Sequence, residues 1–293
     1  MRFSVVAFCY IKDKIWREKQ IRIAREKCNE YVKYACDHQN EIISNKTSAI
    51  ILGQDVPITI FPHMALVQIW PEKNKRKVSS CGGSLISEYF VLSAAHCIYH
   101  VKNYQIAIKL GSATRFADDT GQWFRASEIY VHPEYSDYSG VNDVLLIKLD
   151  RKVNFSRNAR PICLNTKFNI ELYDLVIATG WGRTEYQNYS PRLKMVEITL
   201  FHPETCCKIT KHFHNPNIIC AVDPNSSKSV HQGDSGGPLQ VRLDTCAYVY
   251  EQIGVIHAVQ NCEIRLDKPL YSLYTKVEPY VPWIASNVWP DEP

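Results

Sequence analysis

Short segments in which apolar residues recur at every second position restrict the fold of this 293-residue sequence more than any other feature. They occur at Ile106–Leu110 and at Val196–Leu200, each bounded by turn-forming residues. A period of two is typical of a β-strand with one buried face. Apolar runs at Val144–Ile147 and Ile253–Ile256 indicate strands buried on both faces. Strands and helices do not alternate regularly, so we expect an all-β body and no parallel α/β sheet.

The first 49 residues have a different pattern. Lys12–Cys36 is rich in charge, and its apolar residues fall at three- and four-residue spacing, which predicts a helix. A solvated linker with helical bias is the alternative, because an isolated helix of this length is marginal in water. The apolar run that ends at Ile11 lacks a small-residue cleavage site, so residues 1–49 are interpreted as a weak or truncated signal region and a prosegment. A further helix is predicted only near the tail, at about Tyr280–Val288.

Composition and charge exclude several classes of protein. Apolar residues make up 45% and charged residues 22%, as in ordinary globular proteins. The net charge of +4 is too small to favour nucleic acid or a membrane surface as a partner, and no apolar segment is long enough to span a bilayer. Eleven cysteines suit an oxidising compartment, where they would form disulfides with one cysteine left over. We therefore expect a secreted, extracellular protein.

A serine between glycines gives the strongest chemical signal. The segment Gly233–Pro238 reads GDSGGP, in which the small residues let the backbone approach a substrate carbonyl. The N–H groups of Gly233 and Ser235 could then converge on one point and stabilise an oxyanion. A tight turn without chemistry is the alternative for this motif taken alone.

Two other motifs supply the partners that such a serine needs. His96 ends an apolar run and is followed by a cysteine, and Asp143 opens a buried strand, where a charge needs a partner. Singly these would be a core histidine and a strand-end cap. A serine hydroxyl becomes a nucleophile when a neutral imidazole takes its proton, and a buried carboxylate fixes the tautomer of that imidazole. The order His96, Asp143, Ser235 therefore predicts a catalytic triad whose activity rises through the histidine titration range.

With these motifs the sequence resembles the trypsin- and chymotrypsin-like serine proteases, peptidase family S1, from Ile50 to the C-terminus. Further matching segments are Pro161–Leu164, Gly180–Thr184 and Tyr274–Val277. Phe61–Ala65 and Gly237–Gln240 resemble the snake-like extracellular cascade proteases of insects. The resemblance implies that residues 50–293 form two packed six-stranded antiparallel β-barrels with a short C-terminal helix and the triad between the barrels.

The resemblance also implies synthesis as an inactive zymogen. In this family a cut releases a new N-terminal amine, which pairs with the aspartate before the nucleophile, here Asp234, and shapes the oxyanion hole. Alignment without gaps places the new N-terminus at Ile50, with Ile51 as the alternative. The preceding Ala49 is not basic, so a trypsin-like activator is not expected to make the cut. An apolar strand without an activation role is the other interpretation of this segment.

The residues that correspond to the family's primary specificity pocket differ from those of trypsin-like members. Ser229 stands where an aspartate would bind a basic side chain, so a preference for arginine or lysine is not expected. His257-Ala258-Val259 replaces the usual Ser-Trp-Gly, and Ser272 replaces a common glycine on the opposite wall. Val259 and Ser272 should narrow the pocket. We expect a preference for small or medium apolar residues, or low general activity.

The family resemblance also suggests disulfides. The implied pairs are Cys81 with Cys97, Cys220 with Cys206 or Cys207, and Cys163 with Cys28 or Cys36. Two family positions that normally bond each other are Val176 and Val241 here. Because His231 replaces the usual partner of Cys262, Cys246 is the suggested partner of that cysteine. Sequence alone does not fix these connections.

The sequence is thus interpreted as a secreted serine endopeptidase precursor. Its expected partners are a protein or peptide substrate and an activating protease, with a serpin-type inhibitor as a candidate third. No cofactor or metal is expected, because the cysteines and histidines between positions 206 and 220 have no recognised zinc-ligand spacing. The alternative is a catalytically weak homologue that regulates or binds within a proteolytic cascade, since a fold does not guarantee a function.

Overall fold

The computed structural model describes most of the chain. The described residues are 5–39, 55–71, 79–99, 103–116, 121–172, 174–184, 189–202, 215–222, 230–246, 248–260 and 271–292. Ile50, Ser229, Cys206, Cys207 and Cys262 lie outside these ranges, as does the expected cut between residues 49 and 50.

The first half of the body is a closed six-stranded antiparallel barrel, with strand order β1-β2-β3-β6-β5-β4. Its strands are β1 (Met64–Pro71), β2 (Ser79–Leu85), β3 (Phe90–Ser93), β4 (Tyr104–Leu110), β5 (Gln122–Val131) and β6 (Leu145–Leu149). The predicted strands at Ile106–Leu110 and Val144–Ile147 correspond to β4 and β6. Alternate residues of β4, such as Ile108, point into the barrel core, and β6 is buried along most of its length.

A second six-stranded antiparallel barrel forms the other half. Its strands are β8 (Leu175–Gly180), β9 (Lys194–Phe201), β10 (Ile218–Val222), β11 (Pro238–Arg242), β12 (Tyr250–Gln260) and β13 (Tyr271–Lys276). They pair in the order β11-β8-β9-β10-β13-β12, and pairing of β12 with β11 closes the barrel. The two-residue strand β7 (Cys163–Leu164) adds a parallel edge beside β12. The expected two-barrel, mostly antiparallel architecture is confirmed.

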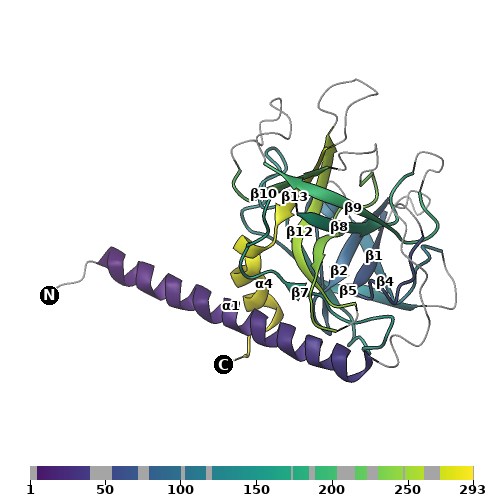
Figure 1. Cartoon of the computed structure of the whole chain (residues 1–293). Coiled ribbons are helices and arrows are strands. Elements are labelled where there is room, and N and C mark those ends of the chain that lie inside the picture. The colour runs from purple at the N-terminus through teal and green to yellow at the C-terminus, as the bar shows by residue number, and fades with distance from the viewer. Residues whose placement is uncertain are drawn as a thin grey trace.

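Helices complete the molecule at both ends. The tail forms a 3-10 turn, η2 (Glu278–Tyr280), and then α4 (Val281–Val288). The N-terminal segment is one helix, α1 (Val5–Asp37), of 33 residues. Figure 1 shows α1 in purple along one side of the body, with its N-terminal part extending away from it. No helix of the described residues is long and apolar enough to cross a membrane.

The C-terminal half of α1 packs against the rest of the molecule. Residues 12–19 are exposed, whereas Ile23, Ala24 and Tyr31 are buried in a hydrophobic cluster that also holds residues of α4. Helix α1 contacts α4 and β7 (Figure 1). The ammonium of Lys27 lies 2.7 Å from a carboxylate oxygen of Glu292. The predicted helix therefore forms, and its second half belongs to the packed body.

Candidate active site

His96 is placed by the first barrel. Strand β3 ends at Ser93, and His96 then opens the short helix α3 (His96–Tyr99). The next residue, Cys97, forms a disulfide with Cys81 of β2, the pair that the family resemblance implied. The side chain of His96 is 28% exposed. The histidine is therefore held by its backbone while its ring keeps access to solvent.

Asp143 lies just before β6, and its side chain is fully buried. One carboxylate oxygen accepts a hydrogen bond from the backbone N–H of His96 at 2.8 Å. The other lies 2.7 Å from Nδ1 of His96 and 2.5 Å from Nδ1 of His257. Burial alone would raise the pKa of Asp143, but the hydrogen bonds from His257 and His96 outweigh it and hold that pKa well below its usual range. The carboxylate therefore stays ionised at neutral pH.

The second barrel delivers His257 to the same carboxylate. In the pairing of β12 with β13, Ile256 lies opposite Tyr274 and Ala258 opposite Leu273, so His257 is the extra residue of a β-bulge. A bulge redirects the side chain that it carries. The ring of His257 meets that of His96 edge to face, with centroids 5.8 Å apart. From sequence His257 was noted only as a departure from the family's serine, and its contact with Asp143 was missed.

The loop that carries Ser235 is fixed to both barrels. The carbonyl of Ser235 accepts a hydrogen bond from the N–H of Gly82 in β2 at 2.7 Å, and Cys97 Sγ lies 3.8 Å from the same oxygen. The next residue, Gly236, donates its N–H to the carbonyl of Ile256 in β12 at 2.8 Å. Ser235 therefore lies beside the loop of His96. Both side chains are described, and no hydrogen bond joins the hydroxyl to the His96 ring in this intact chain.

Gly233 occupies a backbone conformation that favours glycine, with φ of +101°. A Cβ at this position would also lie 2.7 Å from a ring carbon of Tyr189. The guanidinium groups of Arg115 and Arg183 lie 4.3 and 5.8 Å from the centroid of that ring. Both the dihedral angle and the close aromatic ring therefore require glycine at the position assigned to the oxyanion hole.

Asp234 is buried without a cation among the described residues. Its carboxylate accepts the N–H of Gly182 at 2.6 Å and the N–H of His231 at 2.8 Å. A Cβ on Gly180 or Gly182 would overlap this carboxylate, so the two glycines give it room. Burial raises the pKa of Asp234 to about 6, although the two backbone hydrogen bonds lower it. The group is thus a buried acid whose hydrogen-bond donors, in the described parts of the chain, are neutral backbone groups.

The expected pocket residues are only partly described. Ser229 and the side chain of Val259 lie outside the described parts. The backbones of Val259 and Ser272 are direct neighbours across β12 and β13, and Ser272 is buried. The register therefore places the two positions side by side on adjacent strands, and their role as pocket walls stays a prediction.

The described disulfides test most of the expected pairs, whereas the choice of Cys206 or Cys207 as the partner of Cys220 stays a prediction. Cys163 bonds to Cys28 of α1, one of the two partners considered, and Cys220 is disulfide-bonded to a partner outside the described residues. The suggested pair of Cys246 with Cys262 is wrong, because Cys246 bonds to Cys36. The alignment could not show that the end of α1 reaches the loop after β11. At the positions of the lost family bridge, Val176 is buried in the core of the second barrel and the partly buried Val241 packs against that core.

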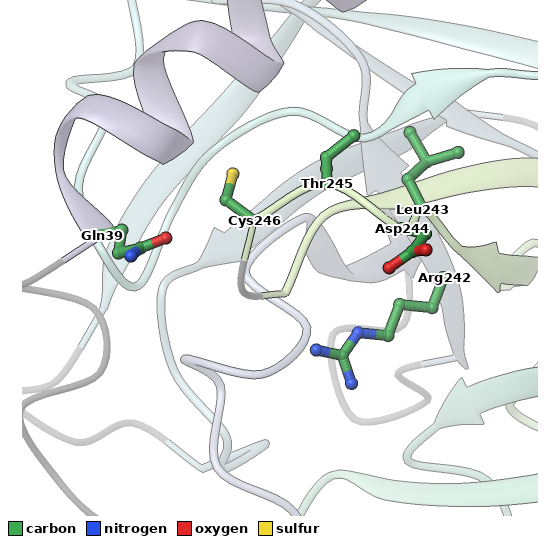
Figure 2. Close-up of a pocket in the computed structure, with 6 residues that line it drawn as sticks. All are labelled: Gln39, Arg242, Leu243, Asp244, Thr245 and Cys246. Atoms are coloured by element: carbon green, nitrogen blue, oxygen red, sulfur yellow. The ribbon is translucent and has the colours of Figure 1, made fainter.

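A hollow of about 500 Å³ lies beside the Cys36–Cys246 disulfide and not at the histidines. Its lining residues are Gln39, Arg242, Leu243, Asp244, Thr245 and Cys246, as Figure 2 shows. It marks the place where the chain leaves α1 toward residues 40–54. None of the expected catalytic residues lines it.

Comparison with known proteins places this geometry in a family. A family model described as Trypsin matches residues 50–284. Mast cell protease 2 of Meriones unguiculatus is 32% identical over 242 residues, which cover 82% of this chain and 90% of that protein. Chymase of Mus musculus is 32% identical over 244 residues, with 82% and 91% covered. Granzyme B(G,H) of Mus musculus is 32% identical over 250 residues, with 83% and 92% covered.

The suggested likeness to the snake-like proteases of insects is not tested by these relatives and stays a prediction. The similarity to mast cell protease 2, chymase and granzyme B extends over both barrels, and its length matches the segment from Ile50 onward. Together with the two six-stranded barrels, it shows that the chain belongs to the trypsin family and is a serine endopeptidase, a hydrolase of peptide bonds.

Proposed function

We propose that this chain is the secreted precursor of a serine endopeptidase in which Ser235 attacks the peptide carbonyl, His96 carries the proton and Asp143 holds the imidazole. The observation that carries the proposal is the buried Asp143 carboxylate, whose oxygens accept both the backbone N–H and Nδ1–H of His96. With Nδ1 so occupied, Nε2 carries the free lone pair that can take the hydroxyl proton of Ser235.

The attack on a carbonyl creates an oxyanion, which the N–H groups of Gly233 and Ser235 would stabilise. Support comes from the positive φ of Gly233 and from the anchoring of the Ser235 loop to β2 and β12. Once activation has fixed both donors in place, they need little rearrangement in the transition state, which is why such donors lower the barrier. In the intact chain no hydrogen bond joins the Ser235 hydroxyl to the His96 ring, which is compatible with the general behaviour of catalytic hydrogen bonds, since these often tighten only in the substrate complex.

Activation is proposed to occur by a cut before Ile50. The new amine would pair with Asp234, whose buried carboxylate has only backbone donors in the described residues. Such a buried charge is costly until a cation joins it. The pairing would draw the Asp234 loop, and with it the N–H of Gly233, into the catalytic arrangement. The activating protease needs to accept Ala49, so it differs from a trypsin-like activator.

Specificity is proposed to favour small or medium apolar residues. The absence of an acid at Ser229 removes the charge that would hold arginine or lysine, and the pairing of Val259 with Ser272 supports two narrowing side chains at one level of the pocket. A panel of peptide substrates that differ only in the residue before the cut tests this. Valine, alanine or leucine substrates should be cleaved faster than arginine ones, and Val259→Gly should shift the preference toward larger residues. Fast cleavage after arginine would overturn the proposal.

The experiment for the function as a whole makes the cut deliberately. Residues 45–49 are replaced by an enteropeptidase recognition sequence, so that enteropeptidase releases Ile50, and a second version places the new N-terminus at Ile51. A fluorophosphonate probe then labels any activated serine. Labelling is expected only in the cut protein with Ile50 first, and not in its Ser235→Ala variant. Correctly cut, folded protein without labelling would favour the regulatory alternative, because the triad would then be present without activity.

A further inference from the structure

Three metal-ligating side chains converge where the two barrels meet. His96, Asp143 and His257 each offer one ligand atom, and these atoms all lie within 4.8 Å of one another. Among the residues that the structure describes, this is the one cluster of at least three metal-ligating side chains. His96 and Asp143 come from the first barrel and His257 from the second. The imidazole at position 257 is the unusual member, because the family usually has serine there.

We propose that this cluster is a binding site for Zn²⁺ and that the bound ion switches the enzyme off. Two imidazoles and one carboxylate form a donor set typical of zinc sites that leave a position for water. Imidazole nitrogen favours Zn²⁺ over Mg²⁺ or Ca²⁺, which prefer oxygen ligands. The ionised Asp143 would balance part of the charge of the ion.

The geometry needs only a small adjustment. The two Nδ1 atoms now lie 2.7 and 2.5 Å from the same Asp143 oxygen as hydrogen-bond donors. Around a tetrahedral zinc ion with bonds of about 2.1 Å, neighbouring ligand atoms stand about 3.4 Å apart, so each imidazole nitrogen would withdraw from the Asp143 oxygen by less than about 1 Å. The ligand atoms of the cluster, which now lie within 4.8 Å of one another, would all reach this separation. The rings of His96 and His257 are 28% and 12% exposed, so an ion has a route from solvent.

Metal binding at Nδ1 changes where each imidazole carries its proton. The neutral ring that now has its proton on Nδ1 would exchange it through water for one on Nε2, so that Nδ1 has a lone pair for the metal. His96 would then carry hydrogen on the nitrogen that faces Ser235 and could not accept the hydroxyl proton. The inhibitory part of the inference rests on the proposed role of His96, whereas the binding part does not.

Binding is tested on the intact Ser235→Ala chain, so that neither activation nor self-cleavage enters. Co²⁺ is the spectroscopic probe, because its visible absorption reports four-coordinate binding, and Zn²⁺ competes it out. The variant His257→Ser restores the residue usual in the family, and His257→Gln keeps a donor to Asp143 should the serine variant not fold. His38→Ser, one residue beyond the end of α1, is the matched control.

We expect one Co²⁺ per chain, displaced by Zn²⁺, with binding at least about tenfold weaker in either His257 variant and unchanged in His38→Ser. Equal binding by wild type and both His257 variants would overturn the site, as would the absence of any Co²⁺ spectrum.

Inhibition is tested on the cut enzyme with a peptide substrate, each variant being compared with its own activity without metal. Zn²⁺ should inhibit wild type at least about tenfold more strongly than His257→Ser, and a chelator should restore activity. Zn²⁺ binding without inhibition of an active enzyme would overturn the switch. A cut enzyme that binds Co²⁺ but has no activity even without metal would count against the proposed function. It would still support the metal site.

Discussion

Asp143 has more interactions than any other side chain proposed for catalysis: three N–H groups converge on its two oxygens. In Asp143→Asn, the amide has one acceptor oxygen and a donor NH₂ group. That NH₂ group would face an imidazole nitrogen and favour the tautomer with hydrogen on Nε2, so His96 could not accept the serine proton. We expect kcat/KM of the cut enzyme to fall by about 10⁴-fold, with KM changed little.

A matched variant for this test is Asp150→Asn. Asp150 directly follows β6, as Asp143 precedes it, and its carboxylate accepts the backbone N–H of Arg125 away from the histidines. Its kcat/KM should stay within about twofold of wild type. A fall of less than tenfold in Asp143→Asn would contradict the role given to that carboxylate.

The sequence identified His96, Asp143 and Ser235 because each sits in a distinctive local motif. It did not reveal that His257 contacts Asp143. A β-bulge depends on the pairing of β12 with β13, and the alternation of apolar residues in one strand does not show where an extra residue enters. A serine-to-histidine difference beside a buried aspartate was the available signal, and only the register of the second barrel makes it interpretable.

The N-terminal helix α1 shows why both a helix and a linker were compatible with the sequence of this segment. Its spacing of apolar residues indicates a helix, but local propensity gives little stability to a helix alone in water. Helix α1 gains stability from contacts that are distant in the chain, including its disulfides to Cys163 and Cys246. The strands of the barrels were predicted better, because their period of two is a local signal.

Two isoleucines on α1 provide a test of this packing. Ile23 is 2% exposed and Ile15 is 60% exposed. In the intact Ser235→Ala chain, Ile23→Ala should lower the free energy of unfolding by about 2 to 4 kcal/mol, because it leaves a cavity in the cluster shared with α4. Ile15→Ala should change it by less than about 0.5 kcal/mol. Urea denaturation measures both, and similar losses in the two variants would mean that α1 is not docked as described.

The two disulfides of α1 also determine what happens to residues 1–49 after a cut before Ile50. Both Cys28–Cys163 and Cys36–Cys246 join α1 to the protease body. The cut protein should therefore run as one species on a non-reducing gel and as two after reduction. Replacing both cysteines of either pair by serine should leave the pieces joined, and replacing all four should separate them under denaturing conditions. Separation after loss of one pair alone would show that the other pair does not form.

The proposed activation would join the new N-terminus at Ile50 to the buried carboxylate of Asp234, far away in the sequence. Gly180 and Gly182 make room for the Asp234 carboxylate. The alignment indicated that this carboxylate pairs with the new N-terminus, but it did not indicate how the carboxylate is held before the cut. Because the donors that surround it are backbone groups of Gly182 and His231, its burial is visible only in three dimensions. The intact chain is thereby expected to hold an unfavourable charge that the cut would neutralise.

This expectation gives a pH dependence of stability. Burial raises the pKa of Asp234 to about 6 in the intact chain, whereas an unfolded aspartate has a pKa near 3.9. Between about pH 4 and pH 6 the folded chain therefore holds a proton that the unfolded chain has lost, and the stability contributed by Asp234 falls as pH rises through that window. A difference of about 2 pKa units corresponds to about 3 kcal/mol.

Urea unfolding of the Ser235→Ala chain, with and without Asp234→Asn, isolates this titration because asparagine stays neutral. In the intact protein the aspartate form should lose about 3 kcal/mol relative to the asparagine form between pH 4 and pH 7. After a cut that releases Ile50, the new ammonium should pair with the carboxylate, so the aspartate form should become the more stable one at pH 7. If the free energies of unfolding of the intact aspartate and asparagine forms changed in parallel with pH, the raised pKa of Asp234 would be refuted. If the difference in stability between the two forms at pH 7 stayed the same after the cut, the pairing of Asp234 with the amine of Ile50 would be refuted.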